Sequence, residues 1–309
     1  MPTSNPAAPD GLSPTDFSGL WIPLITPFTG EAKAVDHTAL QRLLAHYRDT
    51  GISGYVVCGS TGEAAALSPE EQWAVLETVL AHAEGLPVVM GFSGYHLPDA
   101  LAFVEQACTW PIAGLLIPAP HYIRPSQTGL QHWFNRLADA SSKPLIVYDI
   151  PYRTGSTLTL DTLRLLAQHP RIQAIKDCGG DMGKTQHLIA DGLLQVLAGE
   201  DLQMVGTLAA GGCGAIAASA HLCTAQFSQL IRWLQNGHLT QAHPLWAALV
   251  PLVNALFAQP NPACIKSALA QTGLIEDRLR EPMQAANPPF EMRWVSAAVN
   301  AVTPCGPLG

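Results

Sequence analysis

Eight short apolar segments alternate with longer segments of helical periodicity between residues 20 and 217. The apolar segments are nearly continuous and rich in strand-forming residues, which is typical of strands buried on both faces of a parallel sheet. One intervening segment begins with Ser68-Pro69-Glu70-Glu71, a pattern that predicts the capped start of a helix. The predicted strands are 20–25, 55–58, 87–90, 114–117, 144–150, 172–176, 194–198 and 214–217.

Eight strand–helix repeats predict an α/β protein with a closed (β/α)₈ TIM barrel. The alternative is an open doubly wound sheet, but the glycine fingerprint expected after its first strand is missing. The strand pattern stops after residue 217, and helical patterns follow at 225–273 and, more weakly, at 291–302. We therefore expect a flexible leader at 1–18, the barrel at 19–224 and additional C-terminal helices, packed on the barrel, at 225–309.

Composition and charge exclude several classes of protein. Acidic residues outnumber basic residues by 24 to 16, and a nucleic-acid-binding protein normally shows the reverse. The longest uncharged apolar stretch, 244–258, contains Pro251 and Asn254 and is shorter than the roughly 20 residues of a membrane span. Residues 1–18 lack the pattern of a signal peptide. The seven cysteines form no CxxC pair or zinc-type cluster, which favours buried thiols in a reducing cytoplasm and predicts no metal site.

Polar residues follow several of the predicted strands directly. In a barrel of parallel strands, the C-terminal strand ends meet at one face, where barrel enzymes carry their active sites. An amine, phenols, hydroxyls, glycine amides and a guanidinium would therefore share one mouth. The segments that carry them are 59–63, 121–124, 148–155, 176–177 and 199–201.

Lys176 is the most informative of these residues because it closes the apolar strand 172–176. An apolar environment lowers the pKa of a lysine, and the free amine is able to attack a carbonyl group. The resulting iminium withdraws electrons from the adjacent carbon, which lets that carbon lose a proton. The alternative is a structural ion pair with Asp177 or Glu200, and the residues alone leave both interpretations open.

Other strand-end residues suit the binding of an anionic substrate. The segment Gly59-Ser60-Thr61-Gly62-Glu63 offers backbone N–H groups and hydroxyls to a small anion, although an ordinary turn has the same composition. Tyr148 is able to transfer protons if a neighbouring cation or hydroxyl chain lowers its pKa, and the planar guanidinium of Arg153 suits a carboxylate. Their alternatives are a buried tyrosine and a surface ion pair. The glycines of 211–214 precede a strand, so we expect them to serve close packing at the opposite face rather than a phosphate site.

In order along the chain, these segments resemble the dihydrodipicolinate synthase / N-acetylneuraminate lyase family of Schiff-base (β/α)₈ enzymes. The resemblance runs from about residue 17 to about residue 283. It rests on the loop 59–63, the tyrosine–proline–threonine–glycine segment 148–155, the lysine segment 174–177 and Gln259-Pro260-Asn261-Pro262 followed by Lys266. Arg153, the segment 121–127 and the proline–asparagine–proline element are most similar to the synthase branch.

The resemblance implies a pyruvate-dependent synthase that needs no metal or organic cofactor. Lys176 would form the Schiff base with pyruvate, and Gly59, Ser60 and Thr61 would hold the carboxylate of the keto acid. Tyr148, Thr61 or Ser60, and Tyr122 from a neighbouring subunit would relay protons, which implies a homodimer or homotetramer. Arg153 would bind the carboxylate of L-aspartate 4-semialdehyde, and the backbone carbonyl of Ile216 would help to orient the site. The product would be 4-hydroxy-tetrahydrodipicolinate, on the route to lysine.

Several residues depart from the synthase pattern and keep two other hypotheses open. Ser60 replaces a threonine, Asp149 and Asp177 replace an asparagine and a glutamate, and His121 replaces an aromatic residue. Residues 176–180 are closer to the aldolase branch of the family. The second hypothesis is therefore a 2-keto-3-deoxy sugar acid aldolase or dehydratase, or a hydroxyproline-pathway deaminase. The third is a catalytically silent barrel that acts as a sensor or scaffold.

Overall fold

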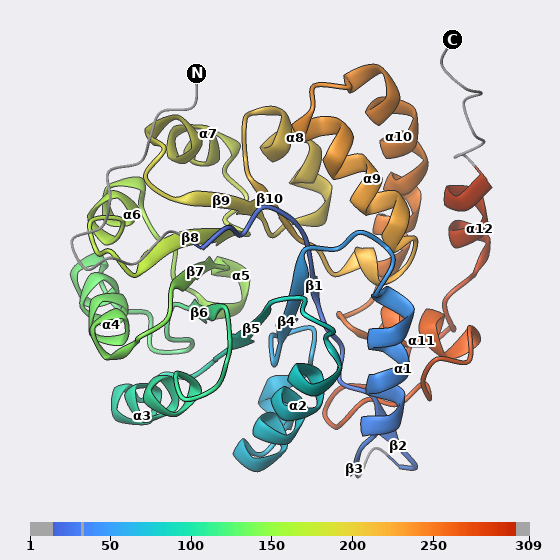
Figure 1. Ribbon diagram of the computed structural model, residues 1–309, viewed down its shortest axis with the longest axis horizontal. Helices are drawn as coiled ribbons and strands as arrows, with labels where there is room; N and C mark the ends of the chain where they lie inside the picture. The colour runs from blue at the N-terminus through green and yellow to red at the C-terminus, as the bar shows by residue number, and fades with distance from the viewer. Residues whose placement is uncertain (1–14, 32–33, 301–309) are drawn as a thin grey trace.

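A closed barrel of eight parallel strands forms the centre of the molecule in the computed structural model, which describes residues 15–31 and 34–300 (Figure 1). Neighbouring strands follow the order β1-β10-β9-β8-β7-β6-β5-β4. The predicted TIM barrel is therefore confirmed, and the open sheet is wrong. The strands are β1 (Gly19–Pro23), β4 (Gly54–Val57), β5 (Val88–Gly91), β6 (Gly114–Pro118), β7 (Leu145–Asp149), β8 (Ile172–Asp177), β9 (Gln195–Ala198) and β10 (Gly214–Ile216).

Helices follow each barrel strand and surround the barrel (Figure 1). The predicted start at Ser68 is a complete capping box: its side chain accepts from the N–H of Glu71, whose carboxylate accepts from the N–H of Ser68. The helices are α1 (His37–Tyr47), α2 (Pro69–His82), α3 (Leu97–Ala107), α4 (Gln127–Ala140), α5 (Pro151–Thr154), α6 (Leu160–Leu166), α7 (Met182–Asp191), α8 (Met204–Ala209) and α9 (Thr224–Gln235).

The C-terminal part is helical, as the sequence indicates, but it is divided into separate helices. They are α10 (Leu239–Leu256), α11 (Ala263–Gln271) and α12 (Arg293–Asn300). Helix α9 packs against β1 and α8, so it completes the eighth strand–helix unit, and the helices added to the barrel begin with α10. The predicted boundary at 224/225 therefore falls one helix too early. In the part of the chain that the structure describes, no helix is both long and apolar enough to span a membrane.

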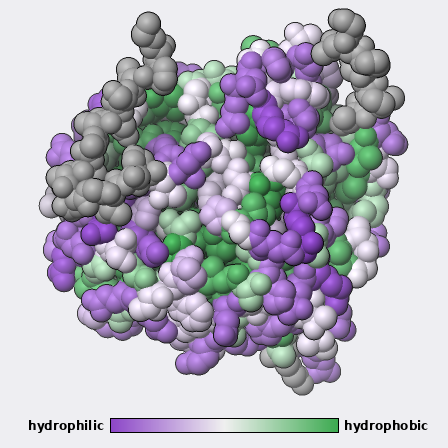
Figure 2. All heavy atoms as spheres, viewed as in Figure 1, coloured by the Kyte–Doolittle hydropathy of each residue, from purple (hydrophilic) through white to green (hydrophobic). Residues whose placement is uncertain are grey.

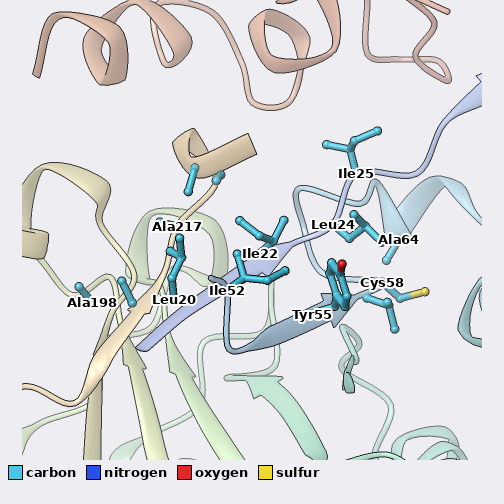
Figure 3. Packing of buried hydrophobic residues seen from close by; sticks show 14 of the residues in the cluster. Leu20, Ile22, Leu24, Ile25, Ile52, Tyr55, Cys58, Ala64, Ala198 and Ala217 are labelled. Carbon is cyan, nitrogen blue, oxygen red and sulfur yellow. The ribbon is translucent and has the colours of Figure 1, made fainter. Parts of the chain in front are cut away.

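Side chains of the barrel strands alternate between two apolar layers. In β1, Leu20 and Ile22 point outward into the layer between strands and helices, where Figure 3 shows them near Tyr55 and Ala217. Trp21 points inward and belongs to a second cluster inside the barrel. Because side chains alternate along a strand, residues two apart share a layer. This alternation decides which strand-end residues reach the barrel interior.

The N-terminal end of the barrel is closed by Phe17, which is completely buried. Its ring contacts Trp21 at a centroid distance of 5.8 Å, and its backbone N–H donates to Oε1 of Gln195 at 2.9 Å. The backbone N–H of Thr15 donates to Oε1 of Gln173 in the same way. Residues 15–18 are therefore part of the barrel, which corrects the predicted leader of 1–18, and residues 1–14 lie outside the described residues.

Of two further features, the sequence patterns predicted one and missed the other. A short antiparallel pair, β2 (Phe28–Thr29) with β3 (Ala34–Val35), follows β1 and was not predicted. The glycine segment before β10 does serve close packing, as expected: a Cβ atom at Gly214 would collide with the backbone of Gly19. In the view of Figure 2, hydrophilic residues predominate toward the edge of the molecule, and apolar residues are visible between them and nearer the centre.

Candidate active site

A cavity of about 350 Å³ opens at the C-terminal ends of the strands and beneath α10. Six of the predicted site residues line it: Ser60, Thr61, Tyr148, Arg153, Lys176 and Ile216. Asn254 and Phe257 from the end of α10 complete one wall. These six residues therefore lie together at one mouth of the barrel, as expected for residues at the C-terminal strand ends.

Strand alternation and register place Tyr148 and Lys176 side by side inside the barrel. Ile146 of β7 and Ala174 of β8 belong to the inner cluster and are register partners. Two residues further along, Tyr148 is the register partner of Lys176, and Nζ of Lys176 lies 4.4 Å from the centroid of the Tyr148 ring. Both side chains therefore occupy the uppermost layer of the interior, directly below the cavity.

The environment of Lys176 favours an uncharged amine. Its side chain is 5% exposed, and burial lowers its pKa from the ordinary lysine value. Glu200 and Asp201 oppose this shift, but no carboxylate in the described part of the chain forms an ion pair with Nζ. The structural ion pair considered from the sequence is therefore absent among the described residues. Gly199 leaves room for the side chain, since a Cβ atom there would lie 2.8 Å from Cγ of Lys176.

Tyr148 is a buried phenol next to the Ser60 hydroxyl. Burial raises its pKa well above the ordinary tyrosine value, and the neighbouring Ser60 side chain only partly opposes the shift, so the lowered pKa expected from the sequence is not found. The phenol is therefore protonated at neutral pH. A protonated phenol that contacts a second hydroxyl is able to donate and accept protons in turn.

The loop after β4 leaves two backbone donors available. The N–H groups of Gly62, Glu63 and Ala64 donate to carbonyl groups within the loop, to Gly59 or Ser60. The N–H groups of Ser60 and Thr61 have no acceptor among the described residues, and both residues line the cavity. Gly62 is required for this path, because a Cβ atom would lie 2.9 Å from the carbonyl oxygen of Leu24. The loop thus has two adjacent backbone donors without an internal acceptor, on residues that line the cavity.

Asn261 contacts this loop, a contact that the sequence patterns did not indicate. Its side-chain amide donates to Oγ1 of Thr61 at 3.0 Å, and it lines the cavity. The proline–asparagine–proline element drew attention to Asn261. It did not indicate the contact with Thr61, because the two residues lie 200 positions apart in the sequence. Asn261 fixes the direction of the Thr61 hydroxyl.

Gly59 and Tyr122 lie elsewhere. Gly59 lines an adjoining cavity of about 430 Å³, which shares Ser60 and Tyr148 with the first and has largely apolar walls. Tyr122 lines neither cavity of its own subunit. Its side chain is 84% exposed, and its φ of 72° lies in the left-handed region.

The two aspartates that depart from the synthase pattern point away from the cavity. Asp149 forms a buried ion pair with Lys184, and Asp177 accepts hydrogen bonds from the N–H of Gly179 and the hydroxyl of Thr185. Because they follow Tyr148 and Lys176 by one position, strand alternation directs them outward. They join the ends of β7 and β8 to α7.

Another buried lysine, Lys266, contacts the loop after β4 on the side away from the cavity. Nζ of Lys266 lies 2.5 Å from a carboxylate oxygen of Glu63 and 4.1 Å from the centroid of the Phe28 ring. Burial lowers the pKa of Lys266 to about 8, and the Glu63 charge opposes this shift. The pair connects the loop after β4 to α11.

Replacing Lys266 with methionine is expected to lower the free energy of unfolding by about 3–5 kcal/mol, because the buried Glu63 carboxylate loses its ion-pair partner and keeps only its contact with Arg280. The double variant Glu63→Gln/Lys266→Met is expected to recover most of this loss. Urea unfolding, followed by circular dichroism, measures both variants. Equal losses in the single and double variants would contradict this interpretation of the pair.

Comparisons with known proteins agree with this geometry. The sequence model of the dihydrodipicolinate synthetase family matches residues 16–294. The chain is 35% identical over 271 residues to 4-hydroxy-tetrahydrodipicolinate synthase 2 of Clostridium acetobutylicum, which covers 86% of this chain and 94% of the relative. It is 34% identical over 270 residues to the 4-hydroxy-tetrahydrodipicolinate synthase of Thermodesulfovibrio yellowstonii, with coverage of 86% and 92%.

A solved structure of a dihydrodipicolinate synthase has the same fold as this chain. The crystal structure of dihydrodipicolinate synthase from Aquifex aeolicus superposes with a TM-score of 0.85 at 28% identity, over 93% of this chain and 97% of that chain. The family match, the relatives and the barrel agree with one another. The chain therefore belongs to the dihydrodipicolinate synthetase family and is a lyase of the class I aldolase type.

Proposed function

We propose that the protein condenses pyruvate with L-aspartate 4-semialdehyde to give 4-hydroxy-tetrahydrodipicolinate, in the cytoplasm and on the route to lysine. The observation that carries this proposal is the presence of Lys176 and Arg153 in the same cavity. Lys176 supplies an amine for the keto acid, and Arg153 supplies a cation for the carboxylate of the aldehyde. The names of the relatives, both 4-hydroxy-tetrahydrodipicolinate synthases, support the same reaction.

The first half of the proposed reaction takes place at Lys176. Its amine adds to the C2 carbonyl of pyruvate and water leaves, while the N–H groups of Ser60 and Thr61 hold the carboxylate. Tyr148 and Ser60 pass the protons that this step and the following enamine formation require. The backbone carbonyl of Ile216, at the cavity wall, orients the adduct. The iminium nitrogen is the electron sink, so this step needs no metal or organic cofactor.

In the second half, the enamine carbon attacks the aldehyde carbon of the acceptor, and a proton from the relay neutralises the new alkoxide. Arg153 binds the acceptor carboxylate, because its planar guanidinium forms paired charge-assisted hydrogen bonds with such a group. The ammonium group of the acceptor then loses a proton to the relay, and the resulting amine adds to C2. The Lys176 nitrogen takes up a proton as it leaves, which closes the ring and regenerates the free enzyme.

We also propose that Tyr122 of a second copy completes the proton relay, in a homodimer or homotetramer. Its phenol is exposed and lies outside both cavities of the same copy of the chain. The adjoining apolar cavity borders Ser60 and Tyr148, so an aromatic side chain that entered it would reach the relay.

Replacing Arg153 with alanine is expected to lower kcat/KM for the aldehyde by about 30–150-fold, the equivalent of about 2–3 kcal/mol for a charge-assisted contact. The rate of imine formation with pyruvate is expected to change by less than about threefold, because Arg153 acts only in the second half. Arg136→Ala is the control, because Arg136 on α4 is exposed and its replacement removes the same charge. Equal losses in both half-reactions would contradict the assigned role.

A coupled assay of the purified protein tests the whole proposal. Pyruvate is offered with L-aspartate 4-semialdehyde, and, in parallel, 2-keto-3-deoxy sugar acids are offered for cleavage or dehydration. Turnover of the semialdehyde at least about 100-fold above that of the sugar acids supports the proposal. The reverse preference would assign the protein to the sugar-acid branch.

A further inference from the structure

Glu200 lines the active-site cavity, yet none of the steps above uses it. It follows the end of β9, and its neighbour Gly199 contacts Lys176. Its side chain is half-buried and interacts electrostatically with Tyr152 and Lys176. A half-buried carboxylate beside the reacting lysine is therefore available to a ligand.

The neighbouring acid, Asp201, has a different role. It is 6% exposed, and it accepts hydrogen bonds from both the N–H and the hydroxyl of Ser219, the former at 2.8 Å. These contacts join the end of β9 to the loop after β10. Both acids line the cavity, but the Asp201 carboxylate is engaged by Ser219, whereas Glu200 has no such partner among residues 15–31 and 34–300.

Arg153 and Glu200 carry opposite charges and line the same cavity. The Arg153 guanidinium lies 5.8 Å from the centroid of the Tyr152 ring, and the Tyr152 side chain interacts electrostatically with Glu200. Neither Arg153 nor Glu200 forms an ion pair with any residue of 15–31 or 34–300. Burial and the adjacent Asp201 raise the pKa of Glu200, which a cation from a ligand would reverse.

We propose that Glu200 binds the α-ammonium group of the second substrate, so that the site selects a zwitterionic amino aldehyde. Arg153 and Glu200 then form a matched pair, one for the carboxylate and one for the ammonium group of the same molecule. This inference rests on the proposed function and specifies the chemistry by which its acceptor is recognised. It assigns to Glu200 a part in substrate selection rather than in proton transfer.

The test compares two aldehydes that differ only in the amine, L-aspartate 4-semialdehyde and succinic semialdehyde. Glu200→Gln keeps the size of the side chain and removes its charge, and Glu77→Gln on the exposed face of α2 is the control with the same change in charge. In Glu200→Gln, kcat/KM for the amino aldehyde is expected to fall by about 10–100-fold. The value for succinic semialdehyde is expected to stay within about threefold. Equal losses for both aldehydes, or no loss, would overturn the inference.

A binding measurement separates this inference from the proposed function. Reduction of the pyruvate imine with borohydride blocks the amine of Lys176 and leaves the acceptor part of the cavity open. Calorimetry then compares L-homoserine with 4-hydroxybutanoate, which again differ only in the amine. Wild type is expected to bind L-homoserine at least about 10-fold more tightly, and Glu200→Gln is expected to lose this difference. Equal affinities in wild type would refute the role of Glu200. If this preference is present but neither aldehyde is turned over, the proposed function fails and the inference stands.

Discussion

Replacing Lys176 with methionine is expected to lower kcat/KM for the condensation by at least about 10⁴-fold, because no other group in the cavity is able to form a covalent adduct with pyruvate. Methionine is similar in length and apolar, so it fits the interior layer below the cavity that Lys176 shares with Tyr148. The free energy of unfolding should therefore remain equal to that of wild type or rise slightly.

The measurement is the coupled assay with purified protein, together with urea unfolding of the same samples. Lys143→Met is the control, because Lys143 lies outside both cavities. A Lys176→Met variant that kept activity within about tenfold of wild type would contradict covalent catalysis at this position.

The lowered pKa of Lys176 also sets the direction of a pH dependence. Only the neutral amine attacks a carbonyl, so the rate of imine formation should rise with pH and level off near the pKa of the folded protein. Because burial lowers that pKa, the plateau should begin below about 10.4, the value for an unperturbed lysine. Stopped-flow measurement of imine formation with pyruvate gives this profile.

Replacing Tyr148 with phenylalanine is expected to lower kcat/KM by about 10²–10³-fold, the usual range for the loss of one proton-transfer group. The ring still fills the inner layer of β7, and only the contact with Ser60 is lost. Since burial keeps the phenol protonated, the activity of wild type should show no titration of Tyr148 between about pH 6 and 9.

Tyr55→Phe is the matched control for this variant. Tyr55 is another buried tyrosine, but its hydroxyl donates to the carbonyl of Leu44, away from both cavities. The coupled assay should find Tyr55→Phe within about threefold of wild type. A Tyr148→Phe variant with the same small effect would remove Tyr148 from the relay.

The features that sequence predicted well are those with a local signal. Continuous apolar segments located the eight strands, and the two-residue alternation of a strand places Tyr148 and Lys176 in one layer. The helix start at Ser68 follows from its own four residues. Each of these features depends on residues that are close together in the sequence, so a single sequence is enough to predict it.

The features that sequence did not predict depend on distant partners. Phe17 closes the barrel because Trp21 and Gln195 surround it, and nothing in residues 1–18 indicates this. The contact of Asn261 with Thr61 and the pair of Lys266 with Glu63 join segments about 200 residues apart. Both contacts depend on how α10 and α11 lie against the barrel, which no local pattern encodes.

The most direct test of covalent catalysis is borohydride reduction of the wild-type protein in the presence of pyruvate, followed by peptide mass mapping. The expected result is one added 1-carboxyethyl group per chain, carried only by the peptide that contains Lys176. An unmodified protein, or an adduct on a different lysine such as Lys266 or Lys184, would contradict the proposed mechanism.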